Sequence, residues 1–177
     1  IPFPLVCFPP ADPEPSGIGE PRCRLDELFS VRDKIVMITG GSSGLGLQLV
    51  RLFMQRGAKV CSIATHHDAK VCAQLLAGIR FHEPVFVDAN LTDGAGIDKA
   101  FTGCEEAFGT AQILFNNAGL SLRKKFLDVG RDDWNRLSDI NLKGMYFVAQ
   151  AAAKRMHEAG TGGTIINMSS ILGGKAM

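Results

Sequence analysis

The most constraining feature of the sequence is an apolar run that breaks into closely spaced glycines. The run covers residues 34–39 (Lys-Ile-Val-Met-Ile-Thr), and Gly40, Gly44 and Gly46 follow it, before the helix-favouring residues 47–50. This order predicts a strand, a tight turn and a helix, because glycine permits sharp turns and close backbone approach. Amides exposed between Gly40 and Gly46, at the positive end of the helix dipole, would bind a pyrophosphate. The alternative is an ordinary strand–helix turn that tolerates glycine.

The chain beyond residue 25 alternates between strand-like and helix-like patterns. We expect strands near residues 35–39, 59–64, 84–87, 112–115 and 164–168. We expect helices over residues 45–56, after Asp68, over residues 93–108 and over residues 132–158. The first helix carries Leu45, Leu49, Leu52 and Phe53 at helical spacing, as an amphipathic helix would. Strands that alternate with helices predict an α/β fold with a doubly wound parallel sheet.

The composition narrows the classes of partner. The 177 residues suit one domain, and the net charge of +1 gives no reason to expect nucleic acid or a membrane surface as partner. No apolar run is long enough to span a bilayer. Five scattered cysteines without metal-ligand spacing predict reduced thiols, no metal site and a cytoplasmic location. Seven prolines in residues 1–24 predict a flexible extension, which leaves residues 25–177 as the folded domain.

Three further motifs follow the glycine-rich turn. Residues 116–119 (Asn-Asn-Ala-Gly) end the fourth expected strand, Asn141 lies in the long helix, and Ser169 and Ser170 follow the fifth strand. In this order and spacing the motifs resemble the short-chain dehydrogenase/reductase family over about residues 25–177. The resemblance implies a Rossmann fold with strand order 3-2-1-4-5 and hydride transfer between NAD(H) or NADP(H) and a carbonyl or secondary alcohol. It also implies a small-molecule substrate and a homo-oligomeric parent enzyme.

The resemblance assigns roles to individual residues. Ser170 corresponds to the serine that hydrogen-bonds the substrate oxygen, and Asn141 to the helix asparagine that supports a proton relay. Turn-capping hydroxyls, and a plain strand-ending turn at residues 116–119, are the alternatives. The expected cofactor contacts are Thr39, Gly40, Ser42, Ser43, Gly44, Leu45, Gly46, Thr65, Asn90, Leu91, Asn117, Ala118 and Gly119.

The end of the second expected strand bears on the choice of cofactor. A carboxylate there would bind the ribose hydroxyls of NAD, whereas residues 64–67 are Ala-Thr-His-His. This segment argues against NAD and favours NADP, with Thr65, His66 and Lys70 as polar contacts. A solvent-exposed loop is the alternative.

The family's catalytic Tyr-x-x-x-Lys pair is not found in the 177 residues. Tyr146, the single tyrosine, is followed four residues later by Gln150, so we expect Tyr146 to be an ordinary helix residue. Two interpretations stay open. We favour the front part of a longer, C-terminally truncated enzyme. The other interpretation is a non-catalytic dinucleotide-binding or interaction module. In both, we expect the chain by itself to be inactive and to bind dinucleotide poorly.

Overall fold

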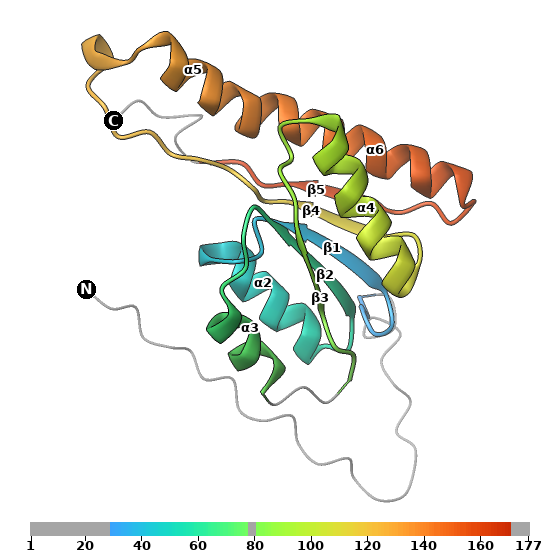
Figure 1. Cartoon of the computed structure of the whole chain (residues 1–177). Coiled ribbons are helices and arrows are strands. Elements are labelled where there is room, and N and C mark those ends of the chain that lie inside the picture. Colours follow the sequence, from blue (N-terminus) through green and yellow to red (C-terminus); the bar gives the residue numbers. More distant parts are fainter. Residues whose placement is uncertain (1–28, 78–80, 171–177) are drawn as a thin grey trace, which may run out of the picture. The chain divides into compact units, whose positions relative to one another are not determined.

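The computed structural model describes residues 29–77 and 81–170. The folded unit begins at Val31 and contains a five-stranded parallel sheet (Figure 1). The proline-rich extension predicted for residues 1–24, and the expected domain start at residue 25, lie outside the described residues. None of the described helices is both long and apolar enough to cross a membrane.

The sheet is built around β1 (Ile35–Thr39), whose last four residues are buried. It pairs with β2 (Lys59–Ala64) on one side and β4 (Ile113–Asn116) on the other. β3 (Val85–Asp88) and β5 (Thr164–Asn167) complete the order β3-β2-β1-β4-β5. The predicted strand order is therefore confirmed, and every strand lies within one or two residues of its predicted position. Because all strands are parallel, their carboxyl ends meet at one edge of the sheet.

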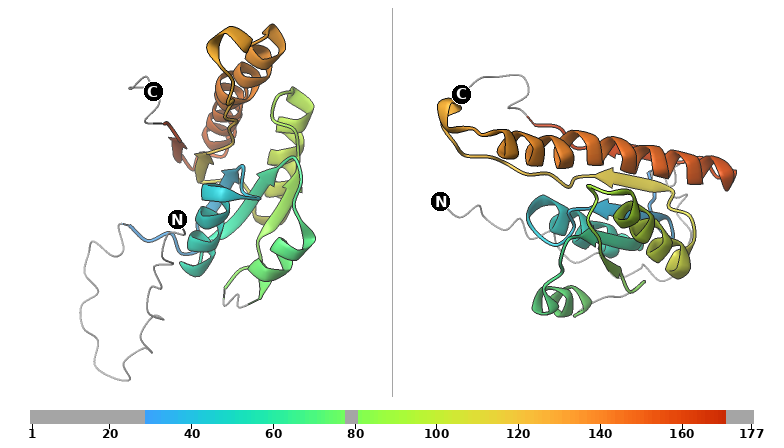
Figure 2. Two further views of the ribbon diagram at one scale, coloured as in Figure 1. Left: turned by 90° about the vertical axis from the view of Figure 1, so that its left-hand side faces the viewer. Right: turned by 45° about the horizontal axis from the view of Figure 1, so that its top comes forward.

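Helices cover both faces of the sheet, as the doubly wound prediction requires (Figure 2). On one face, α2 (Gly44–Gln55) and α3 (Ala69–Leu76) pack on a cluster that includes Val36, Ile38 and Val60. On the other face, α4 (Gly94–Phe108) and α6 (Met145–Glu158) pack on Met37 and Leu114. Alternate residues of β1 thus point into opposite cores, which is the two-residue period of a strand.

Two helices begin at the acidic caps that the sequence suggested. The Asp68 carboxylate accepts hydrogen bonds from the amides of Lys70 (2.9 Å) and Val71 (3.1 Å). The Asp93 carboxylate accepts one from the Gly96 amide at 2.7 Å. Each bond satisfies an amide that the first helical turn leaves without an intrahelical partner.

The buried face of α2 differs from the leucine spacing in the sequence. Gly46, Val50 and Met54 are its buried residues, whereas Leu45 is 70% exposed and Leu52 is 40% exposed. Gly46 lies against the turn that follows β1, since a Cβ there would be 2.1 Å from the Gly40 carbonyl oxygen. Leu49 and Phe53, two of the four residues at the predicted spacing, pack partly buried against the same core. The spacing of the leucines alone could not predict this rotation.

The long helix expected over residues 132–158 is divided into three parts. α5 (Arg131–Ser138) leads into a π-helical stretch, η2 (Asp139–Gly144), and α6 follows it. A short 3₁₀ turn, η1 (Phe126–Asp128), precedes α5. The π-helical stretch contains Asn141, one of the two residues predicted to be catalytic, so the change in helix type falls at a candidate functional position.

Candidate functional site

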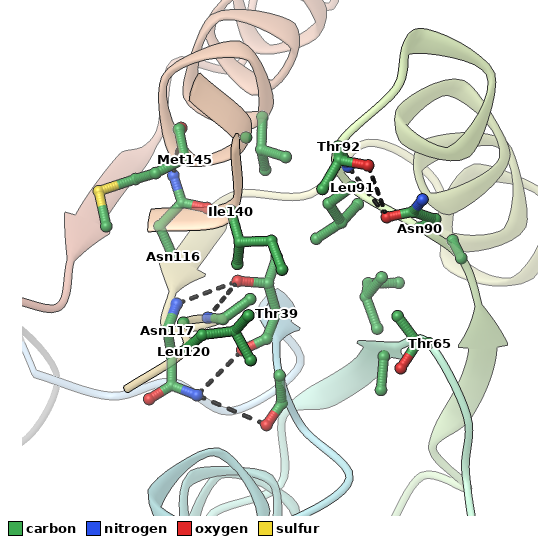
Figure 3. A pocket seen from close by; sticks show the side chains of 18 of the residues that line it. Thr39, Thr65, Asn90, Leu91, Thr92, Asn116, Asn117, Leu120, Ile140 and Met145 are labelled. Carbon is green, nitrogen blue, oxygen red and sulfur yellow. Dashed lines mark hydrogen bonds between the residues drawn. The ribbon is translucent and has the colours of Figure 1, made fainter. Parts of the chain in front are cut away.

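The Thr39 side chain joins β1 to β4 at their carboxyl ends. The buried Thr39 hydroxyl donates to the Phe115 carbonyl oxygen (3.4 Å) and accepts hydrogen bonds from the amides of Asn117 and Ala118, both at 3.0 Å. The Asn117 side-chain amide donates in return to the Thr39 carbonyl at 3.0 Å (Figure 3). This reciprocal set uses the full hydrogen-bonding capacity of the Thr39 hydroxyl. It fixes the point at which the strand order reverses.

The glycine-rich turn is tied to β2 as well as to β4. The amides of Gly40 and Gly41 both donate to the Ile63 carbonyl, at 2.7 and 3.2 Å. Gly40 has a φ of +69°, which an L-residue with a side chain rarely adopts. A Cβ on Gly46 would lie 2.1 Å from the Gly40 carbonyl oxygen. The Gly40 and Gly41 amides are therefore taken up by β2, so the exposed amides expected between Gly40 and Gly46 can only be those that follow Gly41.

The remaining amides of the turn belong to the N-terminus of α2. Ser43 is the N-cap residue, yet its side chain makes no capping hydrogen bond, and the first turn of the helix carries no acidic residue. The first-turn amides therefore lack the side-chain partner that Asp68 and Asp93 supply to α3 and α4. An uncapped, positively polarised helix end suits an anion.

A cavity of about 450 Å³ opens beside this helix end, at the carboxyl ends of the strands. Thr39 and Asn117 lie on one side of it, and Thr65 and Asn90 on the other (Figure 3). The structure brings eleven of the predicted cofactor contacts together in its lining. These are Thr39, Gly40, Ser42, Ser43, Leu45, Thr65, Asn90, Leu91, Asn117, Ala118 and Gly119. Gly44 and Gly46 do not line it.

Sequence reasoning missed about half of the cavity lining. Asn116 is buried, and its side-chain amide donates to the Met145 carbonyl (2.9 Å) and to the Asn167 side-chain oxygen (3.1 Å). The other missed residues are Ile63, Ala64, Ala89, Thr92, Leu120, Ile140, Gly144, Met145 and Val148. Several of them end a strand or follow one directly, and the rule that ligands bind at the carboxyl ends of strands could have found those.

Asn141 does not line the cavity, but it is hydrogen-bonded to a loop that does. Its side-chain oxygen accepts from the Leu120 amide at 2.7 Å, and its side-chain nitrogen donates to the Leu120 carbonyl at 2.8 Å. The side chain therefore positions Leu120, which does line the cavity. Ser170 is exposed, follows β5 by three residues and is likewise not among the lining residues. The two residues predicted to be catalytic are thus not brought into the cavity.

A second polar cluster lies where β2 and β3 end. The His67 imidazole is hydrogen-bonded through Nε2 to the buried Ser62 hydroxyl (3.0 Å) and through Nδ1 to the Asp88 carboxylate (2.6 Å). The hydrogen bond to His67 is the main cause that holds the pKa of Asp88 below its ordinary value. Asp88 is the register partner of Ala64. A carboxylate therefore does lie beside the end of β2, but the neighbouring strand supplies it.

Three further kinds of site, namely a metal site, a reactive thiol and a catalytic tyrosine, were sought in the described residues. Residues 29–77 and 81–170 contain no group of three or more potential metal ligands. Cys61, Cys72 and Cys104 are free thiols, and a side-chain hydrogen bond with Cys104, followed by burial, raises the pKa of Cys61. Tyr146 is 61% exposed, packs edge-on against Phe147 and does not line the cavity.

Comparison with known proteins agrees with this arrangement. The family described as short chain dehydrogenase matches residues 34–177. An NADP-dependent (R)-specific alcohol dehydrogenase of Lentilactobacillus kefiri is 36% identical over 144 residues, which cover 81% of this chain and 56% of that enzyme. An NAD-dependent glycerol dehydrogenase of Listeria innocua is 31% identical over 145 residues, with 82% and 56% coverage.

A solved structure shows the same arrangement of strands and helices. A short-chain type dehydrogenase/reductase from Mycobacterium marinum superposes with a TM-score of 0.80 at 30% identity, over 86% of this chain and 60% of that one. The chain spans little more than half the length of the relatives it matches. With the family match, the strand order and the cavity at the reversal of that order, the chain belongs to the short-chain dehydrogenase family.

Proposed function

We propose that this chain is the dinucleotide-binding part of an oxidoreductase that transfers hydride between NAD(P)(H) and a carbonyl or secondary alcohol. The observation that carries the proposal is the position of the cavity. It lies between the ends of β1 and β4, where the strand order reverses, and the uncapped N-terminus of α2 adjoins it. Open parallel sheets bind their ligands at this point.

The lining supports one orientation of the cofactor. The amides at the start of α2 would hold the pyrophosphate, with Ser42, Ser43 and Leu45 around it. The adenosine end would lie toward Thr65 and Asn90, and the nicotinamide end toward residues 117–119. When bound, the nicotinamide would supply the hydride chemistry. The chain's own residues would bind, orient and shield it from water.

The catalytic roles remain proposals. Ser170 would hydrogen-bond the reacting oxygen of the substrate. Asn141 would support proton transfer by fixing the loop at Leu120, which its side chain holds at both the amide and the carbonyl. We further propose a small-molecule alcohol or carbonyl substrate, a homo-oligomeric parent enzyme, and a reducing, cytoplasmic location that suits the free cysteines.

For the cofactor we propose a mild preference for NADP over NAD. Thr65 lines the cavity, and His66 and Lys70 follow it closely in the chain. A 2′-phosphate would find hydrogen-bond donors there, whereas residues 64–67 offer no carboxylate for the ribose hydroxyls of NAD.

A pair of charge changes on α2 tests the binding site. Ser43→Glu adds a negative charge at the exposed N-cap, where it is expected to weaken NADP binding about tenfold or more through repulsion of the pyrophosphate. The same charge complements the helix dipole, so stability should stay constant or rise by about 0.3–1 kcal/mol. Isothermal titration of the 177-residue chain and urea unfolding measure the two effects.

The matched control adds the same charge at the other end of the same helix. Gln55→Glu places it at the exposed last residue of α2, away from the cavity. This change is expected to leave the dissociation constant for NADP within about twofold of the parent and to lower stability by a few tenths of a kcal/mol. Equal binding by the two variants would refute the proposed site. So would a parent chain that binds neither NADP nor NAD, even at the weak level expected of these 177 residues.

Sequencing the transcript beyond the codon for Met177 tests the proposed catalytic activity. An in-frame Tyr-x-x-x-Lys downstream of Met177 supports the oxidoreductase. A stop codon directly after Met177 supports the non-catalytic dinucleotide-binding module instead.

A further inference from the structure

A buried amide side chain ends strand β4 at the edge of the cavity. Asn116 is only 2% exposed and lines the cavity, yet its side chain has no role in the site described so far. It lies on the same face of the sheet as Leu114, two residues earlier, because side chains alternate along a strand. Buried polar groups are normally hydrogen-bonded, so each atom of this amide should have a partner.

The nitrogen atom of the amide has both of its partners within the protein. It donates to the Met145 carbonyl at the start of α6 (2.9 Å) and to the Asn167 side-chain oxygen at the end of β5 (3.1 Å). These two bonds use both hydrogen atoms that the nitrogen carries. A backbone carbonyl can only accept, so the nitrogen must lie on the Met145 side, and the orientation of the Asn116 amide is fixed.

The oxygen atom of the same amide is different. No residue within the described ranges 29–77 and 81–170 donates a hydrogen bond to it. It is not sealed in the core either, because the buried and half-buried residues of these ranges have no enclosed side-chain oxygen without a partner. The oxygen therefore opens onto the cavity that Asn116 lines, on the side of Ile140 and away from Met145 (Figure 3).

The surroundings make this oxygen an effective acceptor. Ile140 and Met145, which line the cavity beside it, have apolar side chains. A hydrogen bond is stronger among apolar groups than in water, and an acceptor left unpaired there is costly. Because the protein already fixes the amide, little freedom is lost when a ligand binds. Asn116 thus presents a preorganised acceptor for an N–H or O–H group.

We propose that the side-chain oxygen of Asn116 accepts a hydrogen bond from the nicotinamide riboside half of the bound dinucleotide. The inference rests on the proposed dinucleotide site and assigns a further residue to it. In the proposed orientation the adenosine end lies toward Thr65 and Asn90, across the cavity, whereas Asn116 directly precedes residues 117–119 at the nicotinamide end. That half of the ligand carries two kinds of donor, the ribose hydroxyl groups and the carboxamide N–H group.

The test compares ligands of the 177-residue chain that share their adenosine half. NADP carries both kinds of donor, whereas 2′,5′-ADP lacks the nicotinamide riboside half. Asn116→Ala removes the acceptor, so it is expected to raise the dissociation constant of NADP about threefold to tenfold relative to that of 2′,5′-ADP, the loss of one hydrogen bond. The ratio of the two constants cancels any general loss of the site's integrity.

A third ligand identifies the donor. The fragment 2′-phospho-ADP-ribose keeps the ribose hydroxyl groups but has no nicotinamide. If Asn116→Ala weakens its binding as much as that of NADP, the donor is a ribose hydroxyl group. If the variant weakens NADP alone, the donor is the carboxamide. Either result supports the assignment.

The matched control removes a partner of the same amide without touching its oxygen. Asn167 is exposed, does not line the cavity and accepts from the Asn116 nitrogen. Both Asn167→Ala and Asn116→Ala should unfold at lower urea concentration than the parent chain, because each loses a structural hydrogen bond. Only Asn116→Ala should change the ratio, and Asn167→Ala should keep it within about twofold of the parent value.

A measurement on the parent chain decides the matter if Asn116→Ala does not fold. The NMR signal of the Asn116 side-chain carbonyl carbon should move downfield when NADP binds, because the oxygen then accepts a hydrogen bond. The same signal should stay in place when 2′,5′-ADP binds.

The outcomes separate this inference from the function on which it rests. A ratio that Asn116→Ala leaves unchanged, an equal change in Asn167→Ala, or an Asn116 signal that saturating NADP does not move would overturn the assignment. Each of these results leaves the dinucleotide site standing. A parent chain that binds neither NADP nor NAD would overturn both.

Discussion

At the scale of single residues, Gly46 defines how closely α2 can approach the sheet. A Cβ there would lie 2.1 Å from the Gly40 carbonyl oxygen and 2.6 Å from the Asn117 side-chain nitrogen. Backbone must move to admit even one methyl group, so Gly46→Ala is expected to destabilise the fold by about 2 kcal/mol or more. Urea unfolding followed by circular dichroism measures the change.

The control is a glycine in the first turn of another helix. A Cβ on Gly94, at the start of α4, meets nothing within 4 Å. Gly94→Ala should therefore stabilise the chain by about 0.5–1 kcal/mol, because alanine loses less conformational freedom than glycine on folding. Two variants of equal stability would contradict the close approach of α2.

Residues whose role is local could be predicted from the sequence, and residues whose role depends on a distant partner could not. Asp68 and Asp93 were predicted as helix starts because a cap acts within three residues. Leu45 was misjudged because its exposure depends on how the neighbouring Gly46 packs against Gly40 and the distant Asn117. The pairing of His67 with Asp88 joins residues 21 positions apart, and sequence reasoning missed it.

At the scale of elements, the π-helical stretch and the loop after β4 act as one unit. Asn141 contacts both polar backbone atoms of Leu120, at 2.7 and 2.8 Å. Asn141→Ala leaves this half-buried amide without a partner. We expect a cost of about 1–2 kcal/mol and amide hydrogen exchange at Leu120 that is roughly tenfold faster. Exchange measured by NMR reports on this amide directly.

The same substitution on the neighbouring helix is the control. Asn135 is exposed on α5, and Asn135→Ala should leave exchange at Leu120 unchanged. If Asn141→Ala also leaves it unchanged, the side chain does not hold the loop. The sequence marked Asn141 as functional only through its family resemblance. It did not predict the π-helical stretch, since one additional residue in a turn alters the apolar period too little to be noticed.

At the scale of the whole molecule, three aspartates that are hydrogen-bonded to a basic side chain make stability depend on pH. The pKa of each aspartate is lowered, chiefly by a side-chain hydrogen bond from its partner. The pairs are Asp33 with His82, Asp88 with His67, and Asp133 with Lys124. A depressed pKa in the folded state stabilises the protein above the ordinary value of 3.8, and this contribution is lost as the pH falls through the lowered value. The free energy of unfolding should therefore decrease from pH 5 to pH 3.

Adjacent aspartates allow this acid dependence to be assigned. Asp133 bonds to the Lys124 ammonium group and to the Gly130 amide, whereas Asp132 beside it is exposed. Asp133→Asn should lower stability at pH 5 and flatten the decrease toward pH 3, and Asp132→Asn should do neither. Urea unfolding at pH 5, 4 and 3 gives both slopes. Parallel slopes for the two variants would count against the ion pair.

The fold as a whole was the most predictable level. Apolar strands that alternate with capped helices leave few arrangements in which both sheet faces are covered, and the family motifs selected one of them. The part of the cavity lining that was predicted lies mainly in two recognisable motifs, the glycine-rich turn and residues 116–119. Ile140, Met145 and Val148 also line the cavity, but they were missed because they lie about 100 residues after the turn and belong to no recognised motif.

The Thr39 hydroxyl and the Asn117 amide have a consequence for redesign. The bonds that join β1 to β4 also form one wall of the cavity. Substitutions on that wall, made to admit a larger ligand, would therefore also remove the hydrogen bonds between the two central strands. The cavity can be enlarged instead by smaller side chains on its opposite side, at Thr65 and Asn90, or at Ile140. These side chains take no part in the hydrogen bonds between Thr39 and Asn117.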